Sequence, residues 1–499
     1  MKKTTWILTS LLATLLLSSL AYSQAFWNGN PIAEFLDPNT AEAYHDFLVE
    51  TVMPEVVNAG RTGDNNPEDD TGVTISDPDR CWNGYTLLCS QSGHQTEPDG
   101  PLYTAILVDM EGNLVREWAC EGTPMKMVPG GHIWGGAPAP AGGRTLTLMD
   151  WDGNILRQVD RNYRHHHDFQ IEGSPVGYCS PGAEPMLEGG KCLILARSSP
   201  DPNLTAHICG WTLRDEALWE LDADNNVLWQ WEGCEHLEQW GFDEAARDGM
   251  MKVRVGRGNT QDWLHANAAS WVGPNKWFDE GDLRFHPDNV IVSLRTVNIS
   301  AIVARHDHPD GQWASGDVVW RVGPDYSADR PEHKIGQIIG QHHTHMIPRG
   351  LPGAGNILIF DNHSDAGFGA VVPGLASGTY PNTLADFSRV IEFNPVTLDL
   401  VWEYRQQHPT EDLDGDGDIK GNERKFFSAR VSGAQRLENG NTLICEGGAG
   451  RIFEVTVDGD IVWEYISPYT GEIDAEVPRN QTYRAYRVPA SWLPEGAGN

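Results

Sequence analysis

The chain has 499 residues and a formal net charge of −34 at pH 7. Because such a charge repels phosphates, it excludes nucleic acid as a partner, and an anionic substrate would need a local cationic pocket. The length is sufficient for several small domains or for one large repeat architecture.

The first 23 residues have the pattern of a secretory leader. A basic end at Lys2 and Lys3 is followed by an apolar run over residues 6–20 and by a small-x-small cleavage site at 21–23. This pattern favours a cleaved leader over an uncleaved membrane anchor. No later stretch reaches the roughly 20 apolar residues that a membrane span requires. We therefore expect a periplasmic or secreted protein without a membrane span.

Export places the eight cysteines in an oxidising compartment, where disulfides form. The connectivity of eight cysteines cannot be deduced from sequence. Short separations favour local pairing, so we expect Cys81 to pair with Cys89 and Cys209 with Cys234. No spacing of two cysteines is typical of a zinc site.

Residues 24–80 differ from the rest of the chain. Apolar residues recur at helical spacing over 31–59, which predicts one or two helices packed outside the main domain. Residues 61–80 are rich in Asp, Asn, Pro and Gly, and we expect them to form a loop.

The remainder is organised by a recurring strand that ends in tryptophan or another large residue, with a turn signal in front of most copies. The six copies lie at residues 112–118, 153–159, 226–231, 317–322, 399–404 and 460–465. Alternating strands precede most of them, at 105–109, 145–149, 217–221, 389–393 and 451–455. Further strands lie earlier, at 191–195, 289–293, 356–360 and 441–445.

Four-stranded units repeated six times predict an all-β fold, a six-bladed β-propeller over residues 81–490, with a short N-terminal helical segment. The alternative is a pair of β-sandwiches. Sandwiches would not repeat a tryptophan-ended hairpin six times, so we favour the propeller.

Three groups of histidines stand out among the 18 in the chain. They are His-His-His-Asp-Phe at 165–169, Asp-Trp-Leu-His-Ala-Asn at 262–267 and Gln-His-His-Thr-His at 341–345. Arg295 and Asn298 follow a strand between the last two groups. Because the innermost strands of successive blades converge on a central channel, we expect these residues to meet there.

Imidazoles and a guanidinium in one pocket suit transfer of a sulfuryl or phosphoryl group. Imidazole is nucleophilic at neutral pH, a second imidazole can move a proton, and arginine presents a fixed fork to a tetrahedral oxyanion. Together these groups fit a covalent histidine intermediate. Two alternatives remain open. The histidines can bind zinc, copper or iron, or be ordinary polar residues at strand ends, as we expect for His286, His306, His308, His333 and His408.

Seven motifs occur in one order over about residues 100–466, and through them the chain resembles the bacterial aryl-sulfate sulfotransferases, the exported type that uses no activated nucleotide donor. The motifs are His-His-Asp-Phe at 166–169, Asp-Trp-Leu-His-Ala-Asn at 262–267, Ser-Leu-Arg at 293–295, Gln-His at 341–342, Phe-Asp-Asn at 360–362, Ser-Arg-Val-Ile-Glu at 388–392 and Asn-Gly-Asn-Thr-Leu at 439–443.

The resemblance implies a six-bladed propeller whose channel holds one transiently sulfurylated histidine, which by motif match is His342. It implies that His265 and Arg295 bind the sulfuryl oxygens and that His167 is a proton donor or a charge stabiliser. The reaction would be ping-pong: His342 attacks the sulfur of an aryl sulfate, a phenolate leaves, and a phenol takes the group. No cofactor is expected for catalysis.

Further residues are expected to contact the substrate: Asn267, Asn298, His343 and His166. The histidine runs leave the register open, so His166 and His343 are also alternates for His167 and His342. An apparent insertion at residues 273–288 separates His265 from Arg295. The helical N-terminal segment departs from family members that carry a β-domain there.

Residues 412–423 fit the twelve-position EF-hand loop, with glycine at position 6. Its expected Ca²⁺ ligands are Asp412, Asp414, Asp416, Asp418 and Glu423. We expect a structural Ca²⁺ with no part in catalysis. The alternative is a solvated acidic turn.

Two other functions are weighed against the sulfotransferase. One is a non-catalytic, calcium-bound propeller that binds an anion or a protein partner. The other is a quinone-dependent dehydrogenase, which the absence of an adjacent cysteine pair and the count of six hairpins disfavour. The expected partners are a small-molecule aryl sulfate and a phenol, and a homodimer is left open.

Overall fold

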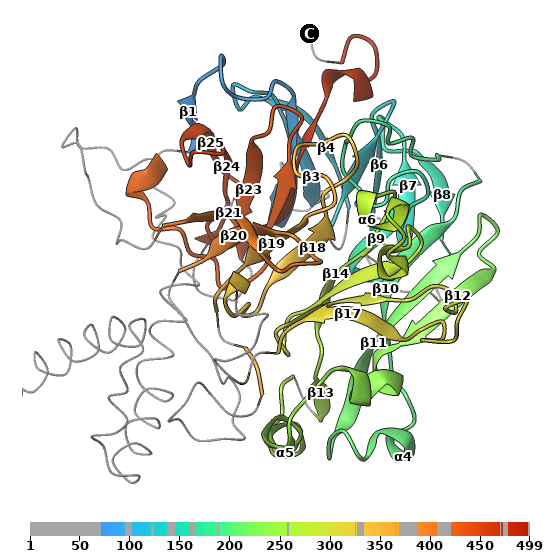
Figure 1. The fold of residues 1–499 in the computed structure, drawn as a ribbon. Helices are drawn as coiled ribbons and strands as arrows, with labels where there is room; N and C mark the ends of the chain where they lie inside the picture. Colours follow the sequence, from blue (N-terminus) through green and yellow to red (C-terminus); the bar gives the residue numbers. More distant parts are fainter. Residues whose placement is uncertain are drawn as a thin grey trace, which may run out of the picture.

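Six small antiparallel sheets are arranged in a ring around a central axis (Figure 1). The predicted six-bladed β-propeller is therefore confirmed. The computed structural model describes residues 71–94, 102–120, 124–136, 145–159, 165–187, 189–256, 259–324, 326, 334–364, 366–368, 387–406, 421–469, 471–472 and 478–497. The predicted leader and N-terminal helices lie outside the described residues.

The blades are numbered along the chain, and each has four strands. Blade 1 contains β2 (Tyr85–His94), β3 (Tyr103–Val108), β4 (Leu114–Trp118) and β28 (Thr482–Val488), and blade 2 contains β5 (Lys126–Val128), β6 (His132–Gly136), β7 (Leu146–Met149) and β8 (Ile155–Gln158). Blade 3 contains β9 (His165–Ile171), β10 (Cys192–Ser198), β11 (Thr212–Leu221) and β12 (Val227–Glu232).

Blade 4 contains β14 (Ala266–Trp271), β15 (Val290–Leu294), β16 (Ile299–Val303) and β17 (Val318–Val322). Blade 5 contains β18 (His342–Met346), β19 (Ile357–Asp361), β20 (Arg389–Phe393) and β21 (Leu400–Arg405), and blade 6 contains β22 (Gly433–Arg436), β23 (Thr442–Glu446), β24 (Arg451–Val455) and β25 (Ile461–Ile466). Short additions are the strand β13 (Thr260–Asp262), the pair β26 (Gly471–Glu472) and β27 (Pro478–Arg479), and the helices α4 (Pro202–Thr205), α5 (Glu244–Lys252) and α6 (Lys276–Asp279).

Both ends of the described chain take part in closing the ring. The C-terminal strand β28 pairs with β2 as the innermost strand of blade 1, so the end of the chain completes the first blade. Strand β1 (Gly72–Ser76) adds a fifth strand to the outer edge of blade 6 by pairing with β25. For Gly72–Ser76 this differs from the loop expected over residues 61–80, because these five residues gain a ladder of backbone hydrogen bonds with β25, while residues 61–70 lie outside the described residues.

The recurring tryptophan has a structural explanation. In five blades the indole N–H of a tryptophan on the second strand of the recurring hairpin (β4, β12, β17, β21 or β25) donates a hydrogen bond to a backbone carbonyl in a turn of the next blade. The donor and acceptor pairs are Trp118 and Asp150 (3.1 Å), Trp231 and Gly316 (3.1 Å), Trp320 and Pro395 (2.8 Å), Trp402 and Val457 (2.9 Å), and Trp463 and Met110 (2.9 Å). The repeat seen in the sequence is therefore a set of links between neighbouring blades.

The copy that lacks tryptophan, in β8, makes the same link by other means. Arg157 donates from Nη2 to the carbonyl of Asp222, which lies in the corresponding turn of blade 3, at 3.4 Å. Its guanidinium also lies over the ring of the buried Trp134. A guanidinium thus replaces the indole as the donor between blades 2 and 3.

The disulfides expected from sequence do not form, because all eight cysteines are free thiols. Cys89 lies inside β2, where its Sγ is 3.3 Å from the carbonyl of Met125, whereas Cys81 precedes that strand. The thiol of Cys209 donates a hydrogen bond to the carbonyl of Trp211 and forms no disulfide with Cys234. Among the helices in the described residues, none is long and apolar enough to cross a membrane.

Candidate active site

The three histidine groups lie where the innermost strands of blades 3, 4 and 5 begin. His165, His166 and His167 open β9, His265 immediately precedes β14, and His342 is the first residue of β18. Because the innermost strands of a propeller run in the same direction along the channel, their first residues meet at one end of it. The fold therefore explains how residues far apart in sequence reach one site.

Each of these strand starts is irregular. The pairing register shifts between residues 194 and 196 opposite the start of β9, between 266 and 268 on β14, and between 342 and 345 on β18. Left-handed backbone angles occur at His167 (φ 62°), His265 (φ 48°) and His343 (φ 53°). Such bulges and angles re-aim side chains and are often found at functional sites.

His342 is held as one tautomer. Its Nδ1 lies 2.7 Å from Oδ1 of Asn362 and 3.1 Å from the carbonyl of Gly340. The amide nitrogen of Asn362 donates to the carbonyls of Ser428 and Val431, which fixes Oδ1 toward the imidazole. Because a carbonyl oxygen can only accept, Nδ1 carries the hydrogen and Nε2 has the free lone pair.

The charge state of His342 suits a nucleophile. Burial, and then the neighbouring charge of Arg295, hold its pKa well below the usual value, although the hydrogen bond to Asn362 acts in the opposite direction. The ring is therefore neutral at neutral pH, and Nε2 is available to attack an electrophile.

Arg295 is placed by its backbone. It follows β15, its N–H donates to the carbonyl of His265 at 3.2 Å, and the next N–H, of Thr296, donates to the carbonyl of Leu264. The side chain is partly exposed, and its charge acts on His342. Blade 4 therefore brings both Arg295 and His265 to His342.

His265 and His167 lie next to each other, with ring centroids 5.0 Å apart. Nδ1 of His265 lies 2.9 Å from Oδ2 of Asp262. Burial opposes the charge of Asp262, but the hydrogen bond with His265 holds the pKa of this carboxyl well below its usual range. The carboxylate thus orients the ring of His265 by accepting a hydrogen bond from its Nδ1–H. Burial, then His166 and His265, keep the pKa of His167 well below the usual value.

Asn267 and Asn298 support the backbone that precedes His342. Nδ2 of Asn267 donates to the carbonyl of Gln341 at 2.7 Å, and Oδ1 of Asn298 accepts from the N–H of Gly340 at 2.9 Å. The first role of both side chains is therefore to position His342. Oδ1 of Asn267 is buried without a hydrogen-bond partner among the described residues.

His343 and His166, the alternates for His342 and His167, have different surroundings. Nδ1 of His343 accepts a hydrogen bond from the N–H of Ala434 on blade 6 at 3.3 Å. His166 lies with Nε2 2.7 Å from Oε2 of Glu216, and its Nδ1 contacts Nδ1 of His167. His343 is thus engaged by the wall of the channel, while His166 lies directly behind His167.

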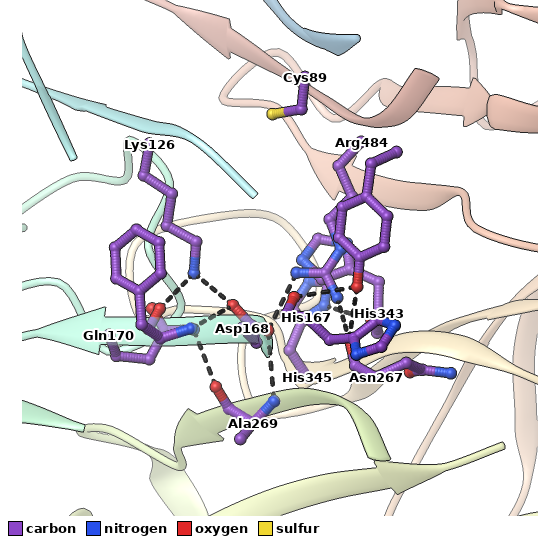
Figure 2. A network of polar contacts seen from close by, with 12 residues as sticks. Cys89, Lys126, His167, Asp168, Gln170, Asn267, Ala269, His343, His345 and Arg484 are labelled. Carbon is purple, nitrogen blue, oxygen red and sulfur yellow. Dashed lines mark hydrogen bonds and ion pairs between the residues drawn. The ribbon is translucent and has the colours of Figure 1, made fainter. Parts of the chain in front are cut away.

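Asp168 ties four blades together beneath the site (Figure 2). Its carboxylate lies 2.7 Å from Nζ of Lys126 on β5 and 2.9 Å from Nη1 of Arg484 on β28, and it accepts from the N–H of Ala269 on β14. Arg484 also donates to the carbonyl of Asn267 at 2.6 Å. This buried network fixes the spacing of the inner strands, and its two cations outnumber its one carboxylate.

Sequence reasoning missed several residues of the site. Asn362 and Asp262 were inside the quoted motifs, and the Asp262–His265 spacing offered a signal for their contact. Arg197, Glu216 and Arg484 lie outside any motif, so nothing in the sequence marked them. Arg197 pairs opposite Glu216 across β10 and β11, its charge acts on His167, and its buried Nε has no hydrogen-bond partner among the described residues.

The alternative that the channel histidines bind a transition metal requires several ligand atoms close together. In the part of the chain that the structure describes, side chains able to hold a metal ion gather at His286, Asp288 and His306, and at Asp215, Glu232 and Cys234. Neither group contains a histidine of the channel. The ring nitrogens of the channel histidines instead contact Asn362, Asp262 or another histidine ring.

A protein-family comparison agrees with this site. The family model for Arylsulfotransferase (ASST) matches residues 186–487, which is more than half of the chain.

The chain belongs to the arylsulfotransferase family. The matched region contains His265, Arg295 and His342 and begins after His167. Membership supports aryl sulfotransferase activity on small molecules. No curated protein matches this member of the family.

Solved structures resemble this arylsulfotransferase-family chain only distantly. A protein of unknown function from Bacteroides caccae is 11% identical, with a TM-score of 0.37 over 81% of this chain and 98% of that one. Virginiamycin B lyase from Staphylococcus aureus is 9% identical, with a TM-score of 0.32 over 80% of this chain and 85% of that one. A quinohemoprotein alcohol dehydrogenase from Pseudomonas putida is 11% identical, with a TM-score of 0.34 over 85% and 74%. Likenesses this low carry no argument about function.

Proposed function

We propose that this chain transfers a sulfuryl group from an aryl sulfate to a phenol through a sulfurylated His342. The observation that carries the proposal is the state of His342. Its Nδ1–H is held by Asn362 and Gly340, its pKa is lowered by burial and Arg295, and its Nε2 is therefore a neutral nucleophile beside a guanidinium.

In the first half-reaction, Nε2 of His342 attacks the sulfur, a nitrogen–sulfur bond forms, and the bond between sulfur and the aryl oxygen breaks. The electron pair of that bond leaves on the phenolate oxygen. Arg295 and His265 bind the sulfuryl oxygens, on which charge is spread in the transition state. Donors that are fixed before the reaction give the main stabilisation in such transfers.

In the second half-reaction, a phenol enters the site from which the first phenol has left. Its oxygen attacks the sulfur and releases its proton, which balances the phenolate that left in the first half-reaction. The nitrogen–sulfur bond breaks, and His342 returns to its neutral form. Because both half-reactions use the same oxyanion contacts, donor and acceptor compete for one site, which is the kinetic pattern of a ping-pong enzyme.

The test is to capture the intermediate. The full-length protein is mixed with 4-nitrophenyl sulfate without acceptor, and we expect a burst of one 4-nitrophenolate per site. Mass spectrometry should then find one sulfuryl group on the peptide that contains His342, and addition of phenol should remove it. Binding of the aryl sulfate without a burst would instead favour the non-catalytic, anion-binding propeller.

Asn362→Ala is expected to lower kcat about 10- to 100-fold with little change in KM, which is the usual size of effect when an orienting partner is lost. The variant loses the acceptor that fixes Nδ1–H and leaves Nε2 free to take up the hydrogen. Steady-state rates with 4-nitrophenyl sulfate and phenol measure the effect. A change confined to KM would mean that Asn362 acts on the substrate and not on His342.

The structural Ca²⁺ also remains a proposal, since the expected ligands Asp412, Asp414, Asp416 and Asp418 lie outside the described residues. Glu423 is buried at the end of the loop. Next to it, Gly421 donates to Glu464 and accepts from Arg451 in blade 6. Through these two hydrogen bonds, an ion bound in the loop would also stabilise blade 6 of the propeller.

Removal of Ca²⁺ by a chelator is therefore expected to lower the melting temperature by a few degrees and to leave kcat of the folded protein unchanged. A ligand present at 100 times its Kd stabilises a fold by about 2.7 kcal/mol. Calorimetry with and without Ca²⁺ measures the shift. Asp412→Ala should melt at one temperature in both buffers, and a Ca²⁺-dependent kcat would contradict a purely structural role.

The proposed location of the reaction depends on the predicted secretory leader. With residues 1–23 removed, we propose that the enzyme acts in the periplasm or outside the cell. An exported enzyme has no supply of nucleotide sulfate donors, which fits the use of an aryl sulfate as donor.

A further inference from the structure

Three buried serines lie behind the residue that orients His342. Ser388 immediately precedes β20 in blade 5, and Ser428 and Ser432 lie just before β22 in blade 6. All three side chains are completely buried. Ser388 and Ser428 contact Asn362 directly, and Ser432 contacts Ser428. Ser388 is also the first residue of the motif at 388–392, which takes no part in the proposed reaction.

Two backbone carbonyls determine which way the amide of Asn362 points. Its Nδ2 lies 2.7 Å from the carbonyl oxygen of Ser428 and 3.2 Å from that of Val431. Because a carbonyl can only accept, these two oxygens take both hydrogens of the amide. A flipped amide would place Oδ1 against two other oxygens and an N–H group against Nδ1 of His342. The two carbonyls therefore turn Oδ1 toward His342, and the longer contact of Nδ1 with the carbonyl of Gly340 acts in the same direction.

The turn that presents these carbonyls is strained. Val431 (φ 53°) and Ser432 (φ 89°) are consecutive residues with left-handed backbone angles. Such an angle is unfavourable for a β-branched residue such as valine, and it persists only where the surrounding structure enforces it. The hydrogen bonds of the serine hydroxyls are therefore needed to hold this turn.

The hydroxyl groups of Ser388 and Ser428 each join two parts of the chain. Oγ of Ser388 accepts from the N–H of Ser428 at 2.8 Å and donates to the carbonyl of Asn362 at 3.0 Å. Oγ of Ser428 accepts from the N–H of Gly448 at 2.9 Å and donates to the carbonyl of Arg430 at 2.7 Å. Because a backbone N–H can only donate, the direction of both hydroxyls is fixed.

Ser432 completes the network from the other end of the turn. Its Oγ accepts from the N–H of Gly447 at 3.0 Å and donates to Oγ of Ser428 at 2.9 Å. Gly447 follows β23, so the strained turn is tied to the body of blade 6. Every hydroxyl of the three serines thus both accepts and donates within the buried network.

We propose that Ser388, Ser428 and Ser432 are positioning residues that select the tautomer of His342. They hold the turn, the turn orients the amide of Asn362, and the amide keeps the hydrogen of His342 on Nδ1, so that Nε2 has the lone pair. The tautomer is a property of the resting protein, whereas its effect on the rate rests on the proposed function.

The tautomer can be measured without any substrate. Histidines of the full-length protein are labelled with ¹⁵N, and the spectrum of His342→Gln identifies the signals of His342 by their loss. We expect Nδ1 of the wild type to have the shift of a protonated ring nitrogen and Nε2 that of an unprotonated one. In Ser428→Ala the carbonyl of Arg430 loses its donor and the turn can relax, so part of the His342 signal should change to the opposite tautomer.

Steady-state rates give a second readout. Loss of a buried hydrogen bond is expected to change a rate about tenfold, so Ser428→Ala should lower kcat with 4-nitrophenyl sulfate by about that factor and leave KM unchanged. If the serine acts only through Asn362, the same substitution should slow Asn362→Ala by less than about twofold. Ser388→Ala breaks the network at another point and should show the same pattern, which keeps the test open if one variant does not fold.

Ser90→Ala is the matched control. Ser90 is a buried serine of blade 1 whose Oγ likewise accepts a backbone N–H, that of Gly93. It should change neither the tautomer nor kcat. An unchanged tautomer in Ser428→Ala, or an equal slowing of the wild type and of Asn362→Ala, would overturn the proposal and leave the serines a purely structural role. A wild-type protein with the expected tautomer but no burst would instead overturn the proposed function, so the two failures are distinguishable.

Discussion

His342→Ala is expected to abolish turnover of 4-nitrophenyl sulfate, with a loss of roughly 10⁴-fold or more, because the variant has no atom to which the sulfuryl group can be bound. Losses of this size are usual when a catalytic nucleophile is removed. The variant should still bind the donor, since Arg295 and His265 remain. The measurement is phenolate release in the presence of phenol, together with the burst in its absence.

His306→Ala serves as the matched control, because His306 is exposed and lies outside the channel. It should keep the wild-type rate and burst. If His342→Ala retained the burst while His343→Ala lost it, the register of the histidine run would be shifted by one residue. Retention of the burst in both variants would contradict a histidine intermediate at this strand.

Arg295→Ala is expected to lower kcat/KM about 10³-fold, the size of loss that follows removal of one donor to an oxyanion. Arg295→Lys should recover part of this loss, because a lysine supplies the charge without the planar pair of N–H donors. Measured kcat/KM values with 4-nitrophenyl sulfate compare the three proteins.

A pH profile separates this role from a loss of structure. Arg295 lowers the pKa of His342, so removal of its positive charge should raise that pKa. The acid limb of the rate profile should then move to higher pH in Arg295→Ala and stay in place in Arg349→Ala, whose arginine is exposed and contacts Asp279. An unchanged acid limb in Arg295→Ala would mean that the two side chains do not interact.

Much of the fold could be predicted, and the reason lies in the outer strands. Strands such as β20 and β24 alternate apolar and polar residues in a regular ladder, and their predicted bounds agree with the structure. The innermost strands were harder to recognise. In β9 and β18 histidines replace the apolar residues, and bulges interrupt the alternation of faces.

Only those residues of the site that lie in a sequence motif were predicted. His167, His265, Arg295 and His342 were found because each lies in a short, recognisable pattern. Glu216 was not, because its contact with His166 spans the intervening strand β10 and depends on burial that no local pattern reveals. Export, the Ca²⁺ loop and the roles of the site residues stay predictions for the experiments above.

The position of β28 has a consequence for how this molecule matures. Arg484 on this strand reaches Asp168 and the carbonyl of Asn267, and Tyr483 reaches the carbonyl of His167. Strand β28 follows every other strand of the propeller along the chain, so a nascent or truncated polypeptide that stops before it has every group that performs the chemistry but lacks the strand that holds them together. Competence for the reaction therefore arrives only once β28 has been translated.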